Sequence, residues 1–428
     1  MKIMITGATG FIGFNLAQKL ASDGHKIVAT ARRAEDWQAR IPAWEWRSCD
    51  FSHDTQAEQW AARVADVDMV INAVGIISED GKQSFERIQT LAPQALFTAC
   101  SQAGVKVIQI SAMGADLPDV AIPFLRTKQL ADDHLWQLPG ECIVIYPSIV
   151  IGQGGSSTEL FCKLSALPII PLPGHGQQTL NPVHIDDLCS AVSHMILHWT
   201  GGKQRHQITG ATTLTLRELY ILLRDWMHLG KARFFPVPMS LLQLFAHMTE
   251  MLKLGGLLNI STLDMLENAS TPEHTYSATP SRPLAEALWS RPASQADSWF
   301  AIMKSIQPLL FASIMLIWIV TGLVSAFWNV PGSYALLASA GVHGPLATLG
   351  IFGGAIFDTG IGLLMLTGWQ RRKVYALQIG MMLTYMLIIS LIIPLAWLDP
   401  LGPVTKNLPM LAATWLLLAL EPRQGRNT

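Results

Sequence analysis

Three glycines near the start of the chain have the spacing of a phosphate-binding turn. Gly7, Gly10 and Gly13 lie in the segment TGATGFIG, which follows an apolar stretch and precedes an apolar helical pattern. Gly7 permits a tight turn, Gly10 lets the backbone approach a pyrophosphate, and Gly13 lets helix and strand pack closely. The first helical turn offers unpaired N–H groups to anionic oxygens. The segment therefore predicts a dinucleotide site, the alternative being a purely structural turn, and its expected contacts are Gly7, Thr9, Gly10, Phe11, Ile12 and Gly13.

Two arginines end the second predicted strand, where the ribose of a dinucleotide lies. Sites that prefer NAD usually carry Asp or Glu there, bonded to the ribose 2′-hydroxyl. Here the strand ends in Arg32 and Arg33. A guanidinium pairs with a 2′-phosphate, which an acidic residue would repel. The sequence thus favours NADP(H) over NAD(H), although a pair of solvated surface arginines is the alternative.

The elements that position these residues are predicted by the first part of the chain. Residues 1–150 alternate short β-branched runs with amphipathic stretches, which predicts an α/β doubly wound Rossmann domain with a parallel sheet. The predicted strands are 2–6, 26–30, 69–73, 105–111 and 142–146.

Beyond residue 150 this alternation ends. Residues 151–267 are expected to form a small substrate-side subdomain, which completes an NAD(P)-binding domain over 1–267. In it, the apolar segment 241–258 is expected to be a lid or, alternatively, a helix on the membrane surface. Residues 268–299 are rich in Ser, Thr, Ala and Pro and are expected to be a linker.

Charge separates the chain into two parts. Residues 301–428 hold 7 Lys/Arg and 3 Asp/Glu, against 23 and 28 in the first 300 residues. Neither part is basic enough to suggest a nucleic-acid partner. The five cysteines lack paired spacing and the twelve histidines lack ligand spacing, so we expect reduced thiols and no metal site.

The last part of the chain has the composition of a lipid-embedded bundle. Residues 305–357 and 374–398 contain no Lys, Arg, Asp or Glu. About 20 apolar residues cross a bilayer, so residues 300–428 are expected to form an all-α transmembrane bundle of about four helices. The alternative is a buried globular bundle. The expected crossings are 306–328, 345–369, 374–397 and, less completely, 407–421.

Basic residues between the spans predict the orientation. Lys304, the cluster 371–373, Arg423 and Arg426 fall on one side, and Lys406 alone on the other. Because Lys and Arg concentrate on the cytoplasmic side, we expect a multi-pass protein of the cell inner membrane with a cytoplasmic N-terminal domain. The first residues also lack the continuous apolar core of a signal peptide.

Six segments resemble the extended and atypical short-chain dehydrogenase/reductase superfamily: TGATGFIG (6–13), CDFSHD (49–54), INAVG (71–75), ISAMGA (110–115), FLRTK (124–128) and YPSIVIG (146–152). Two of them, SAMGA and PSIVIG, are similar to the atypical branch that contains the nucleotide-binding accessory subunit of respiratory complex I. The resemblance covers about the first 260 residues. It implies that Asp50 contacts adenine, although Asp50 is equally suited to capping a helix. It also implies that the cofactor is lined by Ala73, Val74 and Gly75 and flanked at its nicotinamide end by Pro147 and Ser148.

The resemblance breaks at the catalytic tyrosine. Active members carry Tyr and Lys four residues apart, on one helix face. The lysine holds the nicotinamide ribose, and the phenol exchanges a proton with the substrate. Here Lys128 is kept but Phe124 stands at the tyrosine position, so ordinary alcohol–ketone chemistry is expected to be impaired. Ser111 matches the substrate-binding Ser or Thr, and is equally suited to bonding its own strand end.

The membrane part resembles the DoxX-like family of small bacterial membrane domains. The matching segments are FDTGIGLLML (357–366) and WLDPLGPVTKNLP (397–409). Asp358 lies inside a predicted crossing, where a carboxylate costs about 2.5–3.5 kcal/mol and usually serves a partner, a proton or a ligand. A protonated structural acid is the alternative. Nearby glycines, Gly362 among them, are expected to allow close helix packing.

These observations leave two main hypotheses of function. The first is a membrane-tethered NADP(H)-binding oxidoreductase that acts on a lipid-soluble carbonyl or quinone-like substrate delivered through the bilayer. The second is a non-catalytic nucleotide sensor or assembly subunit whose membrane helices dock a membrane protein partner. A third, a transporter regulated by its nucleotide domain, rests on Asp358 alone.

Overall fold

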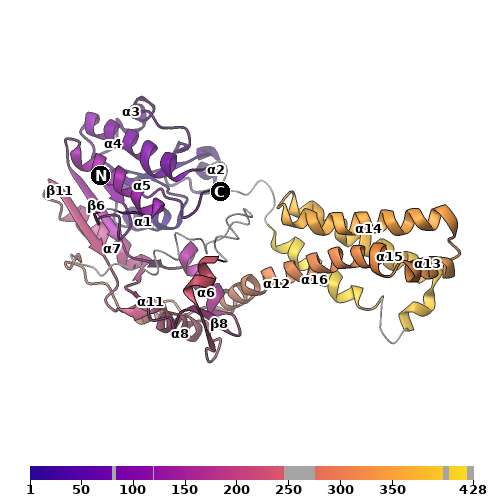
Figure 1. The fold of residues 1–428 in the computed structure, drawn as a ribbon. Coiled ribbons are helices and arrows are strands. Elements are labelled where there is room, and N and C mark those ends of the chain that lie inside the picture. Colours follow the sequence, from indigo (N-terminus) through magenta and orange to yellow (C-terminus); the bar gives the residue numbers. More distant parts are fainter. Residues whose placement is uncertain (80–82, 119, 245–274, 399–403, 422–428) are drawn as a thin grey trace. The chain divides into compact units, whose positions relative to one another are not determined.

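The computed structural model describes residues 1–79, 83–118, 120–244, 275–398 and 404–421. They form two compact units, Met1–Ile302 and Met303–Thr428, which are described separately (Figure 1). A parallel sheet with flanking helices makes up the first unit, and the described part of the second is helical. The predicted fold class, a Rossmann-type domain followed by apolar helices, is confirmed.

A seven-stranded parallel sheet, in the order β11-β6-β5-β4-β1-β2-β3, is the centre of the first unit. The order reverses between β1 and β4, and in such sheets ligands bind outside the carboxyl ends of the strands at that point. The strands are β1 (Lys2–Thr6), β2 (Lys26–Ala31), β3 (Glu45–Ser48), β4 (Met69–Asn72), β5 (Lys106–Ile110), β6 (Cys142–Pro147) and β11 (Lys203–Ile208).

Helices cover both faces of this sheet. Successive strand residues point to opposite faces, so Ile3 and Ile5 enter one core and Met4 the other. The first core contains residues from α1 (Phe11–Ser22), α7 (Ile185–Leu197) and, at its margin, α2 (Ala34–Arg40). The second core contains residues from α3 (Glu58–Val64), the π-helical segment η1 (Glu86–Leu91), α4 (Ala92–Ala103) and α5 (Pro123–Gln137).

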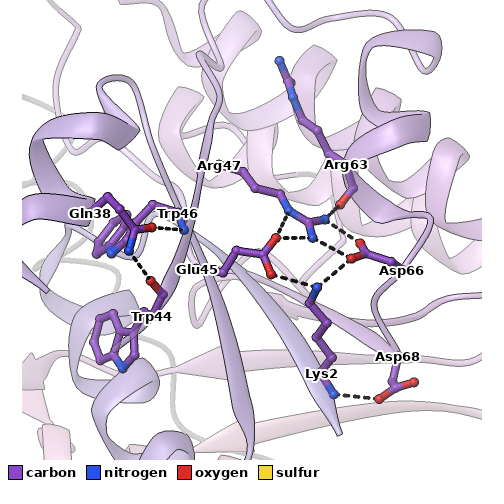
Figure 2. Close-up of polar contacts among 9 residues, drawn as sticks. All are labelled: Lys2, Gln38, Trp44, Glu45, Trp46, Arg47, Arg63, Asp66 and Asp68. Atoms are coloured by element: carbon purple, nitrogen blue, oxygen red, sulfur yellow. Dashed lines mark hydrogen bonds and ion pairs between the residues drawn. The ribbon is translucent and has the colours of Figure 1, made fainter. Parts of the chain in front are cut away.

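Both edge strands, β3 and β11, were missed by the sequence prediction. Their sequences, EWRS and KQRHQI, are polar, as suits strands that pair on one side only. An ionic cluster holds β3 in the sheet at the edge where the amino ends of the strands lie (Figure 2). Lys2 Nζ lies 2.8 Å from Glu45 Oε2 and 2.6 Å from Asp66 Oδ2, and Arg47 pairs with both carboxylates. The cluster joins β1, β3 and the turn before β4, at the edge opposite the glycine turn.

A smaller substrate-side lobe follows β6. Its core joins α6 (Ser156–Ser165), α8 (Leu216–Trp226), α11 (Leu284–Trp289) and the paired strands β8 (Ile170–Pro173) and β13 (Phe234–Val237). Two more short strand pairs lie after β6: β7 (Val150–Ile151) with β10 (Val183–His184), and β9 (Thr179–Leu180) with β12 (Leu214–Thr215).

The expected linker over 268–299 is folded in its described part. Leu284 and Leu288 of α11 are buried in the lobe core, and the Ser298 hydroxyl donates to the carbonyl of Met227. The composition argument failed here because two leucines four residues apart are enough to anchor one helical turn. The expected lid over 241–258 lies, from 245 onward, outside the described residues.

Among the residues that the structure describes, three helices are long and apolar enough to cross a membrane: 295–328, 344–366 and 371–392. The first begins inside the substrate-side lobe as α12 (Gln295–Leu323) and ends with η2 (Val324–Trp328). The other helical elements are α13 (Val330–Ser339), α14 (Gly344–Leu366), α15 (Arg371–Ile392), η3 (Pro394–Leu398) and α16 (Asn407–Leu420).

The fourth expected crossing, α16, returns beside α15. Its 14 residues span about 21 Å, less than the roughly 30 Å of a bilayer core. Arg372, in the first turn of α15, donates to the carbonyls of Leu418 and Glu421 at the end of α16, at 3.0 and 2.6 Å. The two helices therefore run antiparallel, and the end of α16 lies next to the basic cluster 371–373.

Candidate functional site

The glycine turn between β1 and α1 has a geometry that needs glycine. Gly7 has a φ of +70°, and a Cβ on it would lie 2.9 Å from the carbonyl carbon of Ala73. A Cβ on Gly13 would lie 2.2 Å from the Gly7 carbonyl oxygen. Gly10 is the N-cap residue of α1 and has no side chain to occupy the helix N-terminus. The turn thus keeps backbone N–H groups available, as a pyrophosphate requires.

The end of β4 lies directly against this turn, which brings two predicted segments together. Ala73 and Val74 contact Gly7, and Gly75 lies next to Lys128 of α5. A Cβ on Gly75 would be 3.3 Å from Lys128 Nζ, so glycine leaves the ammonium group room beside the β4 loop. These residues fit a dinucleotide that runs from the glycine turn toward Lys128. The space for the dinucleotide depends on glycine at positions 7 and 75, because a side chain at either position would occupy it.

One face of α5 carries Phe124, Lys128 and Asp132, spaced four residues apart. Lys128 is buried, and its Nζ donates to the Ile110 carbonyl at 3.3 Å and lies 5.8 Å from the centre of the Phe124 ring. Burial lowers the pKa of Lys128, although the nearby Asp132 carboxylate opposes that shift. Phe124 packs edge-on against Phe85, 6.0 Å between ring centres, and brings no hydroxyl to the site.

Asp132 is the site residue that sequence reasoning missed. It is 1% exposed, and its Oδ2 accepts a hydrogen bond of 2.5 Å from the hydroxyl of Ser111. Burial raises the pKa of Asp132 to about 7, because a charged carboxylate is costly away from water. The pair Asp132-Asp133 looks like a solvated helix surface. The sequence did contain one indication of this role: Asp132 follows Lys128 by four residues and therefore lies on the same face of α5.

Asp132 ends a chain of buried polar side chains beneath the glycine turn. The Thr6 hydroxyl donates to Asn72, and the Asn72 amide donates to Gln109, at 2.6 and 2.8 Å. Gln109 in turn interacts with Asp132. Tyr146 of β6 is 1% exposed, and its hydroxyl has no hydrogen-bond partner among the described residues.

The predicted ribose and adenine contacts lie on neighbouring strand ends. Arg32 and Arg33 follow β2 and are exposed. Asp50 follows β3, and its carboxylate accepts from the Ser52 N–H at 2.9 Å and contacts His53 Nδ1 at 3.0 Å. Asp50 thus stabilises a local turn two residues on, as Asp often does. The nearest helix, α3, begins only at Glu58, so Asp50 does not cap a helix.

Pro147 and Ser148 lie at the carboxyl end of β6. The Pro147 carbonyl accepts from the Met113 N–H, and the Ser148 hydroxyl donates to the Asn181 carbonyl at 2.5 Å. The ring of Phe11 packs under the loop after β7, where a Cβ on Gly155 would lie 2.8 Å from it. The glycines of this loop let it pack against Phe11 in the first turn of α1. This contact was not predicted from the sequence.

In the second unit, Asp358 of α14 is 9% exposed and accepts a hydrogen bond of 3.3 Å from the hydroxyl of Tyr385 on α15. Close packing of α12 on α14 occurs at two glycines: a Cβ on Gly322 would lie 2.4 Å from Thr359, and one on Gly362 2.6 Å from Ile319. Asp358 therefore has a neighbouring helix as partner. In the described part of the chain, no group of three His, Cys, Asp or Glu side chains could hold a metal ion.

Two families match separate parts of the chain. Residues 3–138 match the NAD dependent epimerase/dehydratase family, which covers β1 to α5 and hence the glycine turn and Lys128. Residues 315–415 match the DoxX-like family, which covers α14 and α15. Both resemblances inferred from the sequence are thereby confirmed.

Curated relatives match about half of the chain at low identity. Mitochondrial NADH dehydrogenase (ubiquinone) 1 alpha subcomplex subunit 9 from Arabidopsis thaliana is 25% identical over 243 residues, which are 54% of this chain and 60% of the relative. Ceramide reductase from Caulobacter vibrioides is 24% identical over 188 residues, 43% of this chain and 57% of the relative. The chain thus spans about three fifths of the length of these two relatives.

A nucleoside-diphosphate-sugar epimerase from Staphylococcus aureus has a similar fold. Its structure superposes with a TM-score of 0.52 at 20% identity and covers 70% of this chain and all of that one. At this identity the likeness concerns the fold alone.

Proposed function

From a chain in which an NAD-binding domain of the epimerase/dehydratase family precedes a DoxX-like membrane domain, we propose a membrane-anchored NADP(H)-dependent oxidoreductase of the cytoplasmic face. The observation that carries the proposal is the buried Lys128 beside Gly75, next to the Ser111–Asp132 pair. A buried lysine and a buried carboxylic acid are costly to keep and cluster at functional sites. A merely structural turn needs neither.

In this proposal each group has one task. The glycine turn and the N-terminus of α1 bind the pyrophosphate, Arg32 pairs with the 2′-phosphate, and Lys128 holds the ribose hydroxyls. When bound, NADPH supplies a hydride to a carbonyl carbon. The chain must then supply a proton to the carbonyl oxygen, and Phe124 has none to give.

Ser111 and Asp132 are suited to supply that proton. Asp132 is protonated in a good part of the molecules near neutral pH, since burial raises its pKa to about 7. Its O–H then donates to Ser111 Oγ, which frees the Ser111 hydroxyl to donate to a substrate oxygen. The proton leaves Ser111 Oγ for the substrate, and Asp132 replaces it. The hydrogen bond between Ser111 and Asp132 supports this transfer.

The substrate class follows from the fusion to membrane helices. A lipid-soluble carbonyl or quinone-like molecule would reach the site from the bilayer. In support, one relative is named ceramide reductase, and the name of another, NADH dehydrogenase (ubiquinone) 1 alpha subcomplex subunit 9, includes a quinone.

A second function is favoured by Phe124. Its ring fills the tyrosine position and packs on Phe85, which suits a subunit that binds NADPH without turnover. Such a protein would sense the nucleotide or assemble with a membrane protein partner through its helices.

Purified full-length protein in detergent or nanodiscs separates the two. NADPH oxidation that depends on an added quinone or long-chain aldehyde, and that Asp132→Asn reduces, supports the oxidoreductase. Saturable NADPH binding without oxidation of the nucleotide supports the sensor. Absence of NADPH binding would contradict both.

A further inference from the structure

The substrate-side lobe exposes apolar side chains that its own core does not need. Strands β8 and β13 pair in parallel, with Phe234 opposite Ile170. Ile170 is buried and Phe234 packs against the lobe core, whereas Ile169 and Phe235 are 57% and 60% exposed. The paired strands β8 and β13 thus direct Ile169 and Phe235 away from the lobe core. We call Ile169, Phe235, Lys231 and Arg233 the β8–β13 patch.

Cations flank these apolar side chains. Lys231 and Arg233, just before β13, are exposed and have no ion-pair partner in the part of the chain that the structure describes. Apolar or aromatic residues beside Lys and Arg are typical of protein surfaces that lie in the lipid interface. The cations attract anionic head groups, while the apolar side chains enter the boundary of the acyl chains.

The start of α12 lies in the same lobe. Ala301 of α12 is buried in the lobe core together with Ile170 and Leu288. The uncharged stretch of the chain begins at Ser305 on the same helix, about 6 Å further along its axis. Trp299 and Phe300, 62% and 52% exposed, precede that stretch. Aromatic residues of this kind gather at the level of the head groups.

We infer that the β8–β13 patch docks the substrate-side lobe on an anionic bilayer surface. Helix α12 carries both Ala301 of the lobe core and the start of the uncharged stretch at Ser305. Docking would bring the substrate-side lobe to the membrane surface. The inference does not depend on which nucleotide binds or on whether turnover occurs.

The five native cysteines allow a direct test. All five are buried, and burial raises the pKa of Cys100, Cys162 and Cys189 to about 12, so an added surface cysteine is labelled selectively. An environment-sensitive fluorophore is placed on Ile169→Cys in the full-length chain. The matched control is Lys26→Cys, an exposed position at the amino end of β2.

Each labelled protein is reconstituted in vesicles of phosphatidylcholine with phosphatidylglycerol, a fraction of which carries brominated acyl chains. We expect the label at 169 to shift to the blue and to be quenched, while the label at 26 keeps the emission of a solvated site. Removing one cation, by Lys231→Gln or Arg233→Gln, should lower the docked-to-undocked ratio about fivefold. Phe235→Ser should lower it as well, and pure phosphatidylcholine should mimic the loss of both cations.

Equal quenching of the labels at 169 and 26 would overturn the inference. So would a blue shift at 169 that persists in detergent without quenching by brominated lipid, because it would indicate a protein partner or a second copy. Phe235 faces outward, so Phe235→Ser is expected to keep its melting temperature. If the melting temperature of Phe235→Ser falls, the comparison of the labels at 169 and 26 in the otherwise native chain still tests whether the β8–β13 patch docks.

Discussion

The proposed acid–base chemistry depends on two buried residues one helical turn apart, Lys128 and Asp132. A charge buried at this depth is tolerated only when it is paired or neutralised. Lys128 has the Ile110 carbonyl, and Asp132 has Ser111. Gln109 also interacts with Asp132, but burial is the larger influence and raises the pKa of the carboxyl group.

The pH dependence of stability tests this assignment. Aspartate in an unfolded chain has a pKa near 3.8, and burial raises it to about 7 in the fold. The folded state therefore holds this proton more tightly. The stabilisation is complete below pH 3.8 and is lost as pH rises through about 7, on the order of a few kcal/mol. Asp132→Asn removes this dependence and keeps an oxygen for Ser111.

We expect the melting temperature of Asp132→Asn, relative to that of the wild type, to rise from acid to mildly alkaline pH. Thermal unfolding of the solubilised chain, followed by tryptophan fluorescence, measures the difference. Asp133→Asn, at the exposed neighbouring position, serves as the control and should show no such trend. A constant difference between Asp132→Asn and the wild type would mean that Asp132 is ionised throughout.

The preference for NADPH is expected to rest on Arg32. Arg32→Glu replaces a cation beside the expected 2′-phosphate by an anion, while the ribose hydroxyl of NADH tolerates either. We expect NADPH affinity to fall about 10- to 100-fold, as for loss of a charged hydrogen bond, and NADH affinity to stay unchanged. Fluorescence titration with both nucleotides measures this. An equal loss for both would contradict the assignment of Arg32 to the 2′-phosphate.

Phe124→Tyr tests whether a missing proton donor limits the chemistry. The new hydroxyl would extend a ring that already lies 5.8 Å from Lys128 Nζ, which would favour its ionised form. We expect unchanged NADPH affinity and a gain of carbonyl reduction of about 100-fold, the scale of general acid catalysis. Phe85→Tyr, on the adjoining ring, is the matched control and should bring no gain. A fall in an existing activity would mean that the phenyl ring serves a different chemistry.

At the scale of elements, the parallel sheet could be predicted where strands are apolar and buried. Five of the seven strands of the main sheet follow from β-branched runs, whereas β3 and β11 consist of polar residues whose pairing depends on tertiary contacts. The same holds for the site. Spacing identified the glycine turn and Lys128, but the role of Asp132 required its burial, which a single sequence does not reveal.

The junction of β1 and α1 is expected to tolerate no side chain at Gly13. A Cβ there would meet the Gly7 carbonyl oxygen at 2.2 Å, and that atom is backbone, so the turn itself would have to move. We expect Gly13→Ala to abolish NADPH binding and to destabilise the first unit by about 1–3 kcal/mol, the range for overpacking. Calorimetric titration and thermal unfolding without nucleotide measure the two effects.

Gly10→Ala provides a graded comparison. Its Cβ would lie 3.2 Å from the same oxygen, a contact that a small shift relieves. We therefore expect weaker nucleotide binding with a smaller loss of stability. If Gly13→Ala kept both its melting temperature and its affinity, helix and strand would not be as close as the structure has them.

At the scale of the molecule, the antiparallel pairing of α15 and α16 constrains how the chain crosses the bilayer. Arg372 bonds the end of α16, so the loop before α15 and the end of α16 lie on the same side. With α12 and α14 as the other spans, we expect the basic cluster 371–373 on the side of the membrane from which α12 starts. Lys and Arg concentrate on the cytoplasmic side of membrane proteins, so this side is expected to be the cytoplasm.

Two single cysteines decide this orientation, because the native thiols are buried. Trp369→Cys lies before the basic cluster, and Leu398→Cys lies at the end of η3, after α15; both positions are exposed, at 56% and 80%. In intact spheroplasts a membrane-impermeant maleimide should label Leu398→Cys and spare Trp369→Cys, and both should react once the membrane is opened. The reverse pattern would put the nucleotide domain outside the cytoplasm, where no NADPH pool would supply it. Labelling of both cysteines in intact spheroplasts would show that α15 does not cross, and the bundle would then lie on the membrane surface.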